Sequence, residues 1–476
     1  MPNSMRPARK PWCLLSASIV LMVLAAALPA RGQSQLSAEV LEKVDAAARQ
    51  VLANSGVPSA SIAIVQDSQI AYLQAYGNAR IDPLATARPD MRYSIGSISK
   101  QFTATAILML AEQGKLSLDD PVSRFLPQLT RAGDVTIRQL LSHTSGYQDY
   151  WPQDYVPPFM LQPMTADKLL ELWAKKALDF EPGTQWQYSN TGYVAAGLIV
   201  EKAAGTPLMQ FLRQRVFSPL GMSTVADVDQ GRLTEPDPTG YTRCALGPLR
   251  PAPKEGKGWL FAAGELAMTA QDLATWNISL ITQKLLKPAS YKEMETEVLL
   301  KNGLASHYGL GLSIRSDSGR RVVAHGGEVS GFTSENVVYP DQRVAITVLT
   351  NQDAVNASGD IARNIARLLF TGEDADTPRF LQLARRVLDD LQNGRIDRSL
   401  FTANANSYFS EEAIHDFASS LGPLGTPKEF VQTSHSNRGG MSFWAYRIRF
   451  AQKTVGLTVR ALPDGKIEQY QVASAD

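Results

Sequence analysis

The chain has 476 residues, of which 44% are hydrophobic and 20% are charged, and it carries 47 Lys and Arg against 46 Asp and Glu. This length favours two domains, because a single hydrophobic core seldom organises more than about 250–300 residues. The near balance of charge argues against nucleic acid or an anionic membrane surface as a partner. The composition is that of a globular protein without low-complexity runs.

The first 32 residues have the pattern of a secretory signal peptide. Arg6, Arg9 and Lys10 precede an apolar run from Cys13 to Leu28, and the segment 30–32 supplies small residues for cleavage. The run is short for a membrane span, so we expect an exported protein, periplasmic or secreted, without other contact with a membrane. An uncleaved anchor is the alternative.

Cleavage would change both the charge and the cysteine count. Removing four basic residues leaves 43 Lys and Arg against 46 Asp and Glu, a net charge of −3. Cys244 would be the only remaining cysteine, so no intramolecular disulfide is expected. The sequence also lacks cysteine–histidine spacing typical of zinc sites, and we expect neither a metal nor a cofactor.

The next 340 residues alternate between helical and strand patterns. Apolar residues at helical spacing predict a helix over 36–54, and "SASIAIVQDSQIAYLQAYG" predicts a hairpin that turns at residues 66–68. Helical spacing returns from Ser97 to Gln113, and Gly114 is placed to end that helix. Residues 115–300 mix helices with loops rich in Pro and Gly.

Strand patterns reappear after residue 300. "RRVVAHGG", "TSENVVYP" and "RVAITVLTN" each predict a strand, and a helix is expected at about 358–370. The order is therefore helix, strands, a helical insertion, strands and helix. The two ends of such a unit can form one antiparallel sheet with helices packed on it, which makes the expected fold class α+β, an α/β sandwich.

A polar break, "TGEDADTP", precedes the last hundred residues. There "RFLQLARRVLDDLQNG" predicts an amphipathic helix, "SFWAYRIRF" alternates with period two, and "LPDGK" predicts a hairpin turn. We expect residues 33–372 to form one domain and residues 373–476 to form a small accessory α+β domain.

Ser97 and Lys100 are the first candidates for catalysis. They lie three residues apart in "YSIGSISKQF", where the apolar helix begins, so their side chains share one face. A serine hydroxyl needs a base to become a nucleophile, and unpaired N–H groups at a helix start favour a nearby oxyanion. The spacing alone is a weak signal, because Ser and Lys also meet three residues apart by chance, and a solvated helix residue is the alternative for Lys100.

Two further segments carry candidate residues. Tyr188 and Asn190 belong to "QYSNTGY", where a tyrosine close to a lysine ammonium can be driven towards phenolate and share the base role. An ordinary loop tyrosine is the alternative. His325 belongs to "AHGGEVSGF", where two glycines let a ligand approach the backbone, although a lone histidine is more often structural than functional.

Other motifs point to structure or are absent. His143 in "LLSHTSGY" is interpreted as a turn residue that orients a loop. Neither G-x-S-x-G nor H-E-x-x-H occurs, which removes the α/β-hydrolase and zincin classes.

In this order, "SISK", "YSN" and "HGG" resemble the serine β-lactamase and penicillin-binding family, most closely its class C, D,D-peptidase and esterase branch. "VTIRQLLSHTSGY", "FEPGTQWQYSNTGY", "PLGM" and "YGLGL" are also similar to segments of that family, and the resemblance covers about residues 36–370. It implies an antiparallel sheet flanked by helices, with a helical subdomain. The last domain resembles cone-shaped accessory domains of the cystatin-like kind.

The resemblance also implies roles for the residues that match. Ser97 would be the acylated nucleophile, with Lys100 and Tyr188 sharing its proton, and Asn190 would bind the substrate amide. The backbone N–H groups of Ser97 and Glu328 would form the oxyanion hole.

The third motif departs from the pattern of many β-lactamases. His325 and Gly326 replace the Lys and Thr that hold a substrate carboxylate in those enzymes, and Gly327 completes the substrate-binding triplet. A histidine is at most partly charged at neutral pH, and Gly326 has no hydroxyl. The departure puts efficient β-lactam hydrolysis in doubt but not peptidase or esterase activity.

Two classes of function follow from these residues. The first is an exported serine hydrolase that forms an acyl-enzyme with esters, D-amino-acid peptides or β-lactams. The second is a protein that binds penicillin or a cell-wall ligand with little or no turnover. A complete set of Ser97, Lys100 and Tyr188 favours the enzyme, because a binding protein needs no base. The sequence does not give the oligomeric state.

Overall fold

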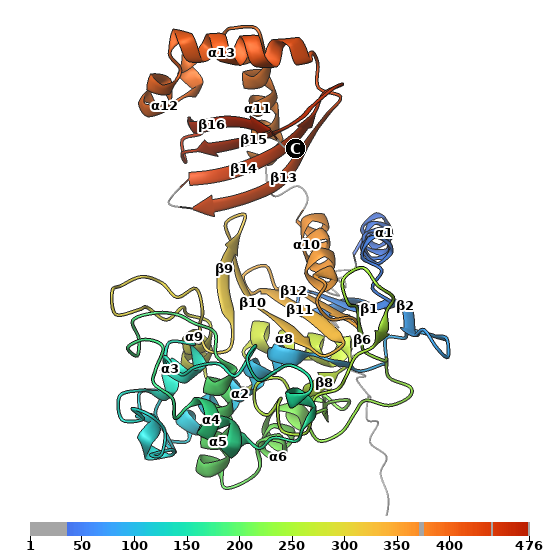
Figure 1. The fold of residues 1–476 in the computed structure, drawn as a ribbon, viewed down its shortest axis with the longest axis vertical. Helices are drawn as coiled ribbons and strands as arrows, with labels where there is room; N and C mark the ends of the chain where they lie inside the picture. Colours follow the sequence, from blue (N-terminus) through green and yellow to red (C-terminus); the bar gives the residue numbers. More distant parts are fainter. Residues whose placement is uncertain (1–35, 371–375, 439–440, 475–476) are drawn as a thin grey trace, which may run out of the picture. The chain divides into compact units, whose positions relative to one another are not determined.

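The structure, a computed structural model, describes residues 36–370, 376–438 and 441–474 (Figure 1). The expected signal segment, residues 1–32, and the expected domain boundary at residues 372 and 373 lie outside these ranges. Within them, every helix is too short or too polar to cross a lipid bilayer.

Residues 36–370 contain ten α-helices and twelve strands among the described residues. The helices are α1 (Ala38–Ser55), α2 (Ser99–Glu112), α3 (Ile137–Leu141), α4 (Ala166–Trp173), α5 (Asn190–Ala204), α6 (Leu208–Leu212), α7 (Ser218–Leu220), α8 (Ala270–Thr282), α9 (Pro288–Met294) and α10 (Ala357–Leu369). The strands are β1 (Ser59–Gln66), β2 (Gln69–Arg80), β3 (Ala85–Thr86), β4 (Tyr93–Ser94), β5 (Ala226–Asp227), β6 (Tyr241–Thr242), β7 (Arg250–Pro251), β8 (Leu266–Met268), β9 (Ser313–Asp317), β10 (Arg320–Val329), β11 (Phe332–Tyr339) and β12 (Val344–Thr350).

Seven of these strands form one sheet in the order β3-β2-β1-β12-β11-β10-β9. Strand β1 pairs antiparallel with β12, so that Ile62 faces Val348 across the pair, and the two ends of this part of the chain meet in the centre of the sheet. The sequence-based expectation of one antiparallel sheet built from both ends is therefore confirmed.

Helices cover both faces of this sheet (Figure 1). Alternate residues of the central strands point to opposite faces. Ile62, Ile64 and Val348 pack with the apolar faces of α1 and α10, whereas Ala63 and Val65 belong to a larger core that includes α2, α5 and α8. Residues between β4 and β8 supply most of the helices on this second side, which matches the expected helical insertion.

The local predictions in this region agree with the structure. Asp67 and Ser68 have φ of 50° and 64° between β1 and β2, as a tight hairpin turn requires. The predicted helix from Ser97 to Gln113 is α2, preceded by the 3₁₀ turn η1 (Gly96–Ile98), and Gly114 follows it with φ of 70°. Ser97 therefore lies in a 3₁₀ turn and not in the first turn of the α-helix.

The last hundred residues fold around their own apolar core. The elements are α11 (Asp376–Gln392), α12 (Ala403–Tyr408), α13 (Glu411–Leu421), β13 (Glu429–Arg438), β14 (Met441–Arg449), β15 (Thr454–Ala461) and β16 (Ile467–Ser474). The four strands form an antiparallel sheet in sequence order, and Trp444, Tyr446 and Ile448 of β14 are buried on one face, as their alternation predicts. This arrangement is the expected small α+β fold, while the division at residue 372 stays a prediction.

Candidate active site

Ser97 lies at the point where a backbone turn meets the edge of the sheet. Gly96 precedes it with φ of 51°, and a Cβ atom at Gly96 would lie 2.7 Å from the backbone nitrogen of Glu328 on β10. A side chain there would meet backbone atoms that cannot move aside. Glycine at position 96 thus brings the turn that carries Ser97 against β10.

Lys100 is fully buried in the first turn of α2. Its Nζ lies 2.9 Å from Ser97 Oγ, 2.8 Å from Asn190 Oδ1 and 2.7 Å from the Ala263 carbonyl oxygen. Burial lowers the pKa of Lys100 to about 7, although the nearby carboxyl groups of Asp149 and Glu265 oppose the change. A substantial fraction of Lys100 is therefore a neutral amine at neutral pH.

The partners of Lys100 determine what the neutral amine does. A neutral amine has two N–H groups and one lone pair, and the oxygens of Asn190 and Ala263 only accept hydrogen bonds. Both N–H groups are then directed to those oxygens, and the lone pair is left for the Ser97 hydroxyl. The lone pair of neutral Lys100 is thereby directed at Ser97 Oγ, and the alternative of a solvated helix residue is excluded by the burial of Lys100.

Tyr188 lies beside this pair and is half-buried. Its ring centre is 5.0 Å from Lys100 Nζ. Burial raises the pKa of Tyr188, and a hydrogen bond with Ser97 opposes the rise. The expected shift towards phenolate is therefore wrong in direction, because burial raises the pKa of Tyr188 and the charge of Asp149 adds to the rise. As a neutral phenol, Tyr188 can pass a proton rather than hold a negative charge.

Asn190, the first residue of α5, is held by a carboxylate that the sequence analysis missed. Its backbone nitrogen donates to Asp149 Oδ1 at 3.0 Å, and its Nδ2 donates to Oδ2 of the same residue at 3.1 Å. These contacts leave the Asn190 side-chain oxygen facing Lys100. Burial raises the pKa of Asp149 to about 6, so the carboxylate is mainly ionised at neutral pH.

His143 fixes the loop that carries Tyr188. It has φ of 60°, its Nδ1 accepts from the backbone N–H of Ser189 at 3.1 Å, and its ring centre lies 4.2 Å from that of Tyr188. Burial lowers the pKa of His143 well below its usual value, so the ring stays neutral. The interpretation of His143 as a residue that orients a loop agrees with these contacts.

His325 lies on the sheet side of the same cluster. Its Nε2 is 2.8 Å from the hydroxyl of Tyr308, and its Nδ1 is 2.5 Å from the carbonyl oxygen of Gly326. Burial, together with the charge of Lys100, lowers the pKa of His325 to about 4. His325 is therefore neutral at physiological pH, which goes further than the partial charge expected from the sequence.

The edge of β10 is open beside Ser97. Strand β9 pairs with β10 only from Arg320 to Ala324, so no strand among the described residues pairs with residues 325–329 on that side. A Cβ atom at Gly327 would lie 1.9 Å from the carbonyl oxygen of Ile95, which explains why glycine is required there. The edge therefore runs directly past the turn that carries Ser97.

An open cleft of about 1150 Å³ joins these groups. Six of the seven predicted site residues are among its described lining residues. The seventh, Lys100, is fully buried and contacts Ser97. None of the described lining residues is Lys or Arg, whereas Glu328, Glu335 and Asp353 are acidic. The described residues also contain no group of three His, Cys, Asp or Glu side chains arranged to hold a metal ion.

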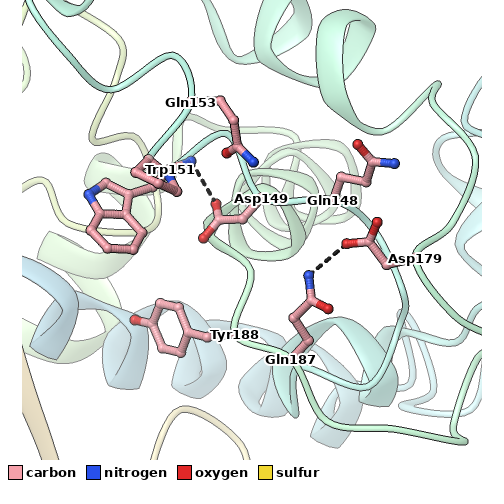
Figure 2. Close-up of a pocket in the computed structure, with 8 residues that line it drawn as sticks. Gln148, Asp149, Trp151, Gln153, Asp179, Gln187 and Tyr188 are labelled. Carbon is pink, nitrogen blue, oxygen red and sulfur yellow. Dashed lines mark hydrogen bonds between the residues drawn. The ribbon is translucent and has the colours of Figure 1, made fainter.

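A smaller cavity of about 340 Å³ adjoins the cleft at Tyr188 and Trp151 (Figure 2). Its other lining residues are polar side chains and one proline, namely Gln148, Asp149, Pro152, Gln153, Asp179 and Gln187. The sequence analysis named none of these residues, because the segments 148–153 and 179–188 come together only in the folded chain.

Comparison with known proteins identifies the family. The profile of the Beta-lactamase family matches residues 44–369. Penicillin-binding protein 4* of Bacillus subtilis (strain 168) is 26% identical over 368 residues, 74% of this chain and 79% of that protein. A D-aminopeptidase of Brucella anthropi is 26% identical over 312 residues, 65% of this chain but only 59% of the length of that protein.

Among solved structures, a D-stereospecific amidohydrolase from Streptomyces sp. aligns with a TM-score of 0.58 and 29% identity, covering 69% of this chain and 98% of the other. The profile match includes Ser97, Lys100, Tyr188 and His325 within one continuous region of the chain. The chain therefore belongs to the β-lactamase family, and it is a serine hydrolase related to penicillin-binding proteins and D-aminopeptidases.

Proposed function

We propose that this protein hydrolyses esters or amides of D-amino acids through an acyl-enzyme on Ser97. The observation that carries the proposal is the 2.9 Å separation of Lys100 Nζ and Ser97 Oγ, with a lysine whose pKa is about 7. A general base is most useful when its pKa lies near the working pH.

Acylation uses Lys100 as the base. Ser97 Oγ bonds to the substrate carbonyl carbon as its proton moves to Lys100 Nζ, and the carbonyl oxygen becomes an oxyanion that accepts from the N–H groups of Ser97 and Glu328. The oxyanion then re-forms the carbonyl as the bond to the leaving group breaks. Tyr188 gives its proton to the leaving atom and regains one from Lys100.

Deacylation reverses the roles of these groups. A water molecule attacks the acyl carbon while its proton passes through Tyr188 to Lys100, and the second tetrahedral intermediate expels Ser97 Oγ. Lys100 returns the proton to the serine, which restores the enzyme and releases a carboxylic acid. Asn190 binds the substrate amide and orients Lys100.

The charge of the cleft supports neutral or cationic substrates over substrates with a carboxylate. His325 is neutral, Gly326 has no hydroxyl, and no described lining residue of the cleft is Lys or Arg. β-Lactams and D-alanyl-D-alanine carry a carboxylate close to the bond that is cleaved, so they are expected to be weak substrates. The D-aminopeptidase and D-stereospecific amidohydrolase relatives support the choice of D-amino-acid amides.

Export to the periplasm or the medium is part of the proposal. It rests on the basic residues, the apolar run and the small residues of segment 1–32. N-terminal sequencing of the protein from the cell envelope or the medium tests it, and a chain that keeps Met1 in the cytoplasm would contradict it.

The catalytic proposal is tested on purified mature protein. Wild type and Ser97→Ala are assayed with p-nitrophenyl butyrate, D-phenylalanine amide, D-alanyl-D-alanine and a chromogenic cephalosporin, and a fluorophosphonate adduct is mapped by mass spectrometry. We expect the first two substrates to be turned over, and Ser97→Ala to lose roughly 10³-fold or more in rate and all labelling.

Ser99→Ala is the matched control, because Ser99 is the second serine of the same motif and its Oγ instead accepts from the backbone N–H of Leu266. It should keep the adduct on Ser97. Full activity in Ser97→Ala would refute the mechanism. Stoichiometric labelling of Ser97 without turnover of any substrate would favour the binding protein instead.

A further inference from the structure

The cavity beside Tyr188 is the strongest further feature of the molecule. Figure 2 shows Gln148 and Gln187 close to Asp179, whereas the Asp149 carboxylate points towards Trp151 with Gln153 beside it. Tyr188 and Trp151 line both this cavity and the catalytic cleft. The cavity and the cleft therefore adjoin at these two side chains.

The glutamine side chains are anchored by their amide nitrogens. Gln148 Nε2 donates to the Ala177 carbonyl oxygen at 2.9 Å, and Gln187 Nε2 donates to Asp179 Oδ2 at 2.6 Å. The amide nitrogen of Gln153, in the orientation that satisfies its neighbours, donates to the carbonyl oxygens of Asp149 and Trp151 at 3.2 and 3.3 Å. These contacts fix the amides and leave few N–H groups for a ligand.

The groups that remain are mainly acceptors. Within the described residues, the structure records no donor to the side-chain oxygens of Gln148 and Gln187 or to Asp179 Oδ1. Each of these oxygens can accept two hydrogen bonds, whereas Gln148 and Gln187 retain one N–H each. Among the described residues, two carboxylates and no Lys or Arg line the cavity. The cavity therefore matches a ligand that donates several hydrogen bonds and carries positive charge.

From this geometry we propose that the cavity binds a primary ammonium group on the leaving-group side of the substrate, held by Asp179 and the side-chain oxygens of Gln148 and Gln187. An ammonium group supplies three N–H donors and one positive charge. The leaving-group side follows from the proposed function, on which this inference rests, because Tyr188 gives a proton to the leaving atom and forms one wall of the cavity. A lysine-like side chain next to the cleaved bond is the corresponding substrate feature.

The test compares two peptides that differ only by an ammonium group. D-Alanyl-D-lysinamide and D-alanyl-D-norleucinamide have side chains of similar length, and their cleavage between the two residues is followed by chromatography. We expect kcat/KM to favour the lysyl peptide by roughly three- to tenfold, as for a partly exposed ion pair with added hydrogen bonds. Asp179→Asn should reduce this ratio to about one, because Asn keeps an acceptor for Gln187 but loses the charge.

Glu181→Gln is the matched control. Glu181 lies two residues further along the chain, carries the same charge and pairs with Arg131 outside the cavity. This variant should keep the preference for the lysyl peptide. Its loss in both variants would assign the effect to net charge alone and overturn the proposal.

A binding measurement separates this proposal from the proposed function. Calorimetric titration of Ser97→Ala with the two peptides needs no turnover, and we expect the lysyl peptide to bind more tightly by the same factor. A second outcome is that wild type cleaves neither peptide while the difference in binding persists and disappears with Asp179→Asn. That result would support the ammonium subsite and refute the proposed D-peptidase activity. Equal affinities, or no measurable binding of the lysyl peptide, overturn the subsite.

Discussion

The contact between Asp149 and Asn190 predicts a specific effect of replacing Asp149 with asparagine. Asp149 Oδ1 accepts from the backbone N–H groups of Asn190 and Trp151, and Oδ2 accepts from Asn190 Nδ2. An asparagine that keeps the first two contacts directs its own Nδ2 at Asn190 Nδ2. Because two donors then face each other, we expect the side-chain amide of Asn190 to rotate by half a turn, so that its nitrogen and oxygen exchange places.

The turned amide would disable the base. Asn190 Nδ2 would replace its oxygen at 2.8 Å from Lys100, and the lone pair of the neutral lysine would accept from Asn190 instead of from Ser97. We expect kcat/KM for a neutral ester to fall by about 10²-fold, the lower end of the range for general base catalysis. Loss of the Asp149 charge, which raises the pKa of Lys100, should lower that pKa by up to about one unit.

The assay is the pH dependence of kcat/KM between pH 5 and 9 for p-nitrophenyl butyrate. The proposed mechanism needs neutral Lys100, so the wild-type rate should rise with pH around 7, and the rise should move to lower pH in Asp149→Asn. Exchanging the pair, in Asp149→Asn with Asn190→Asp, returns an acceptor to Lys100 and places a carboxylate against it. We expect this double variant to recover at least tenfold in rate and to shift the rise above pH 7.

A purely structural role for Asp149 would lower stability without moving the pH profile. Wild-type kcat/KM with an unchanged profile in Asp149→Asn, or a double variant no faster than the single one, would refute the proposed orientation of Lys100.

Three further predictions follow from the same groups. Lys100→Met should abolish turnover and raise the free energy of unfolding by about 1–3 kcal/mol at pH 6, where burial of the lysine is most costly because the residue is charged in the unfolded chain. The gain in stability should shrink at pH 9, which lies above the folded pKa of Lys100, about 7, and closer to the pKa in the unfolded chain. A gain that is the same at both pH values in urea unfolding would contradict this prediction. With His325 neutral above its pKa of about 4, KM for a carboxylate substrate should show no histidine-linked change between pH 6 and 8, and His325→Lys should lower that KM while leaving KM for a neutral ester unchanged. A chain that ends at Gly372 should stay folded and active towards esters, since none of the predicted site residues lies after Gly372. Loss of activity in two chains truncated close to Gly372 would show that the last hundred residues complete the core or the site.

The sequence identifies those parts of the site that depend on local spacing. Ser97 and Lys100 are one helical turn apart, so their contact follows from secondary structure alone. The motif "HGG" lies at the end of an alternating strand pattern, and the two glycines indicate a close approach that the structure places at Gly327 and Ile95. Five strands of the seven-stranded sheet, β1, β2 and β10 to β12, were predictable from their period-two or apolar patterns, whereas the short edge strands β3 and β9 were not predicted.

Features that depend on tertiary contacts were not predictable in this way. Asp149 is 41 residues from Asn190 in the chain, and Tyr308 is 17 residues from His325. No periodicity connects such pairs. The charge states of Tyr188 and His325 could not be predicted either. Burial shifts the pKa of both residues, and the sequence alone does not show how deeply their side chains are buried. An acidic residue shortly after the "HTSGY" segment was the one available signal for Asp149.

The contact between the serine turn and β10 has a consequence for how the enzyme loses activity on heating. Gly96 meets Glu328 and Gly327 meets Ile95 through backbone atoms, and Ser334 Oγ donates to the Ile95 carbonyl oxygen at 2.8 Å. Apart from the Ser334 hydroxyl, this contact is made by backbone atoms, which cannot rearrange while the rest of the sheet stays intact. Separation of the nucleophile from the oxyanion donors therefore requires the sheet itself to open. Thermal inactivation should then coincide with cooperative unfolding of residues 36–370, and the protein should retain nearly full activity until a few degrees below its Tm.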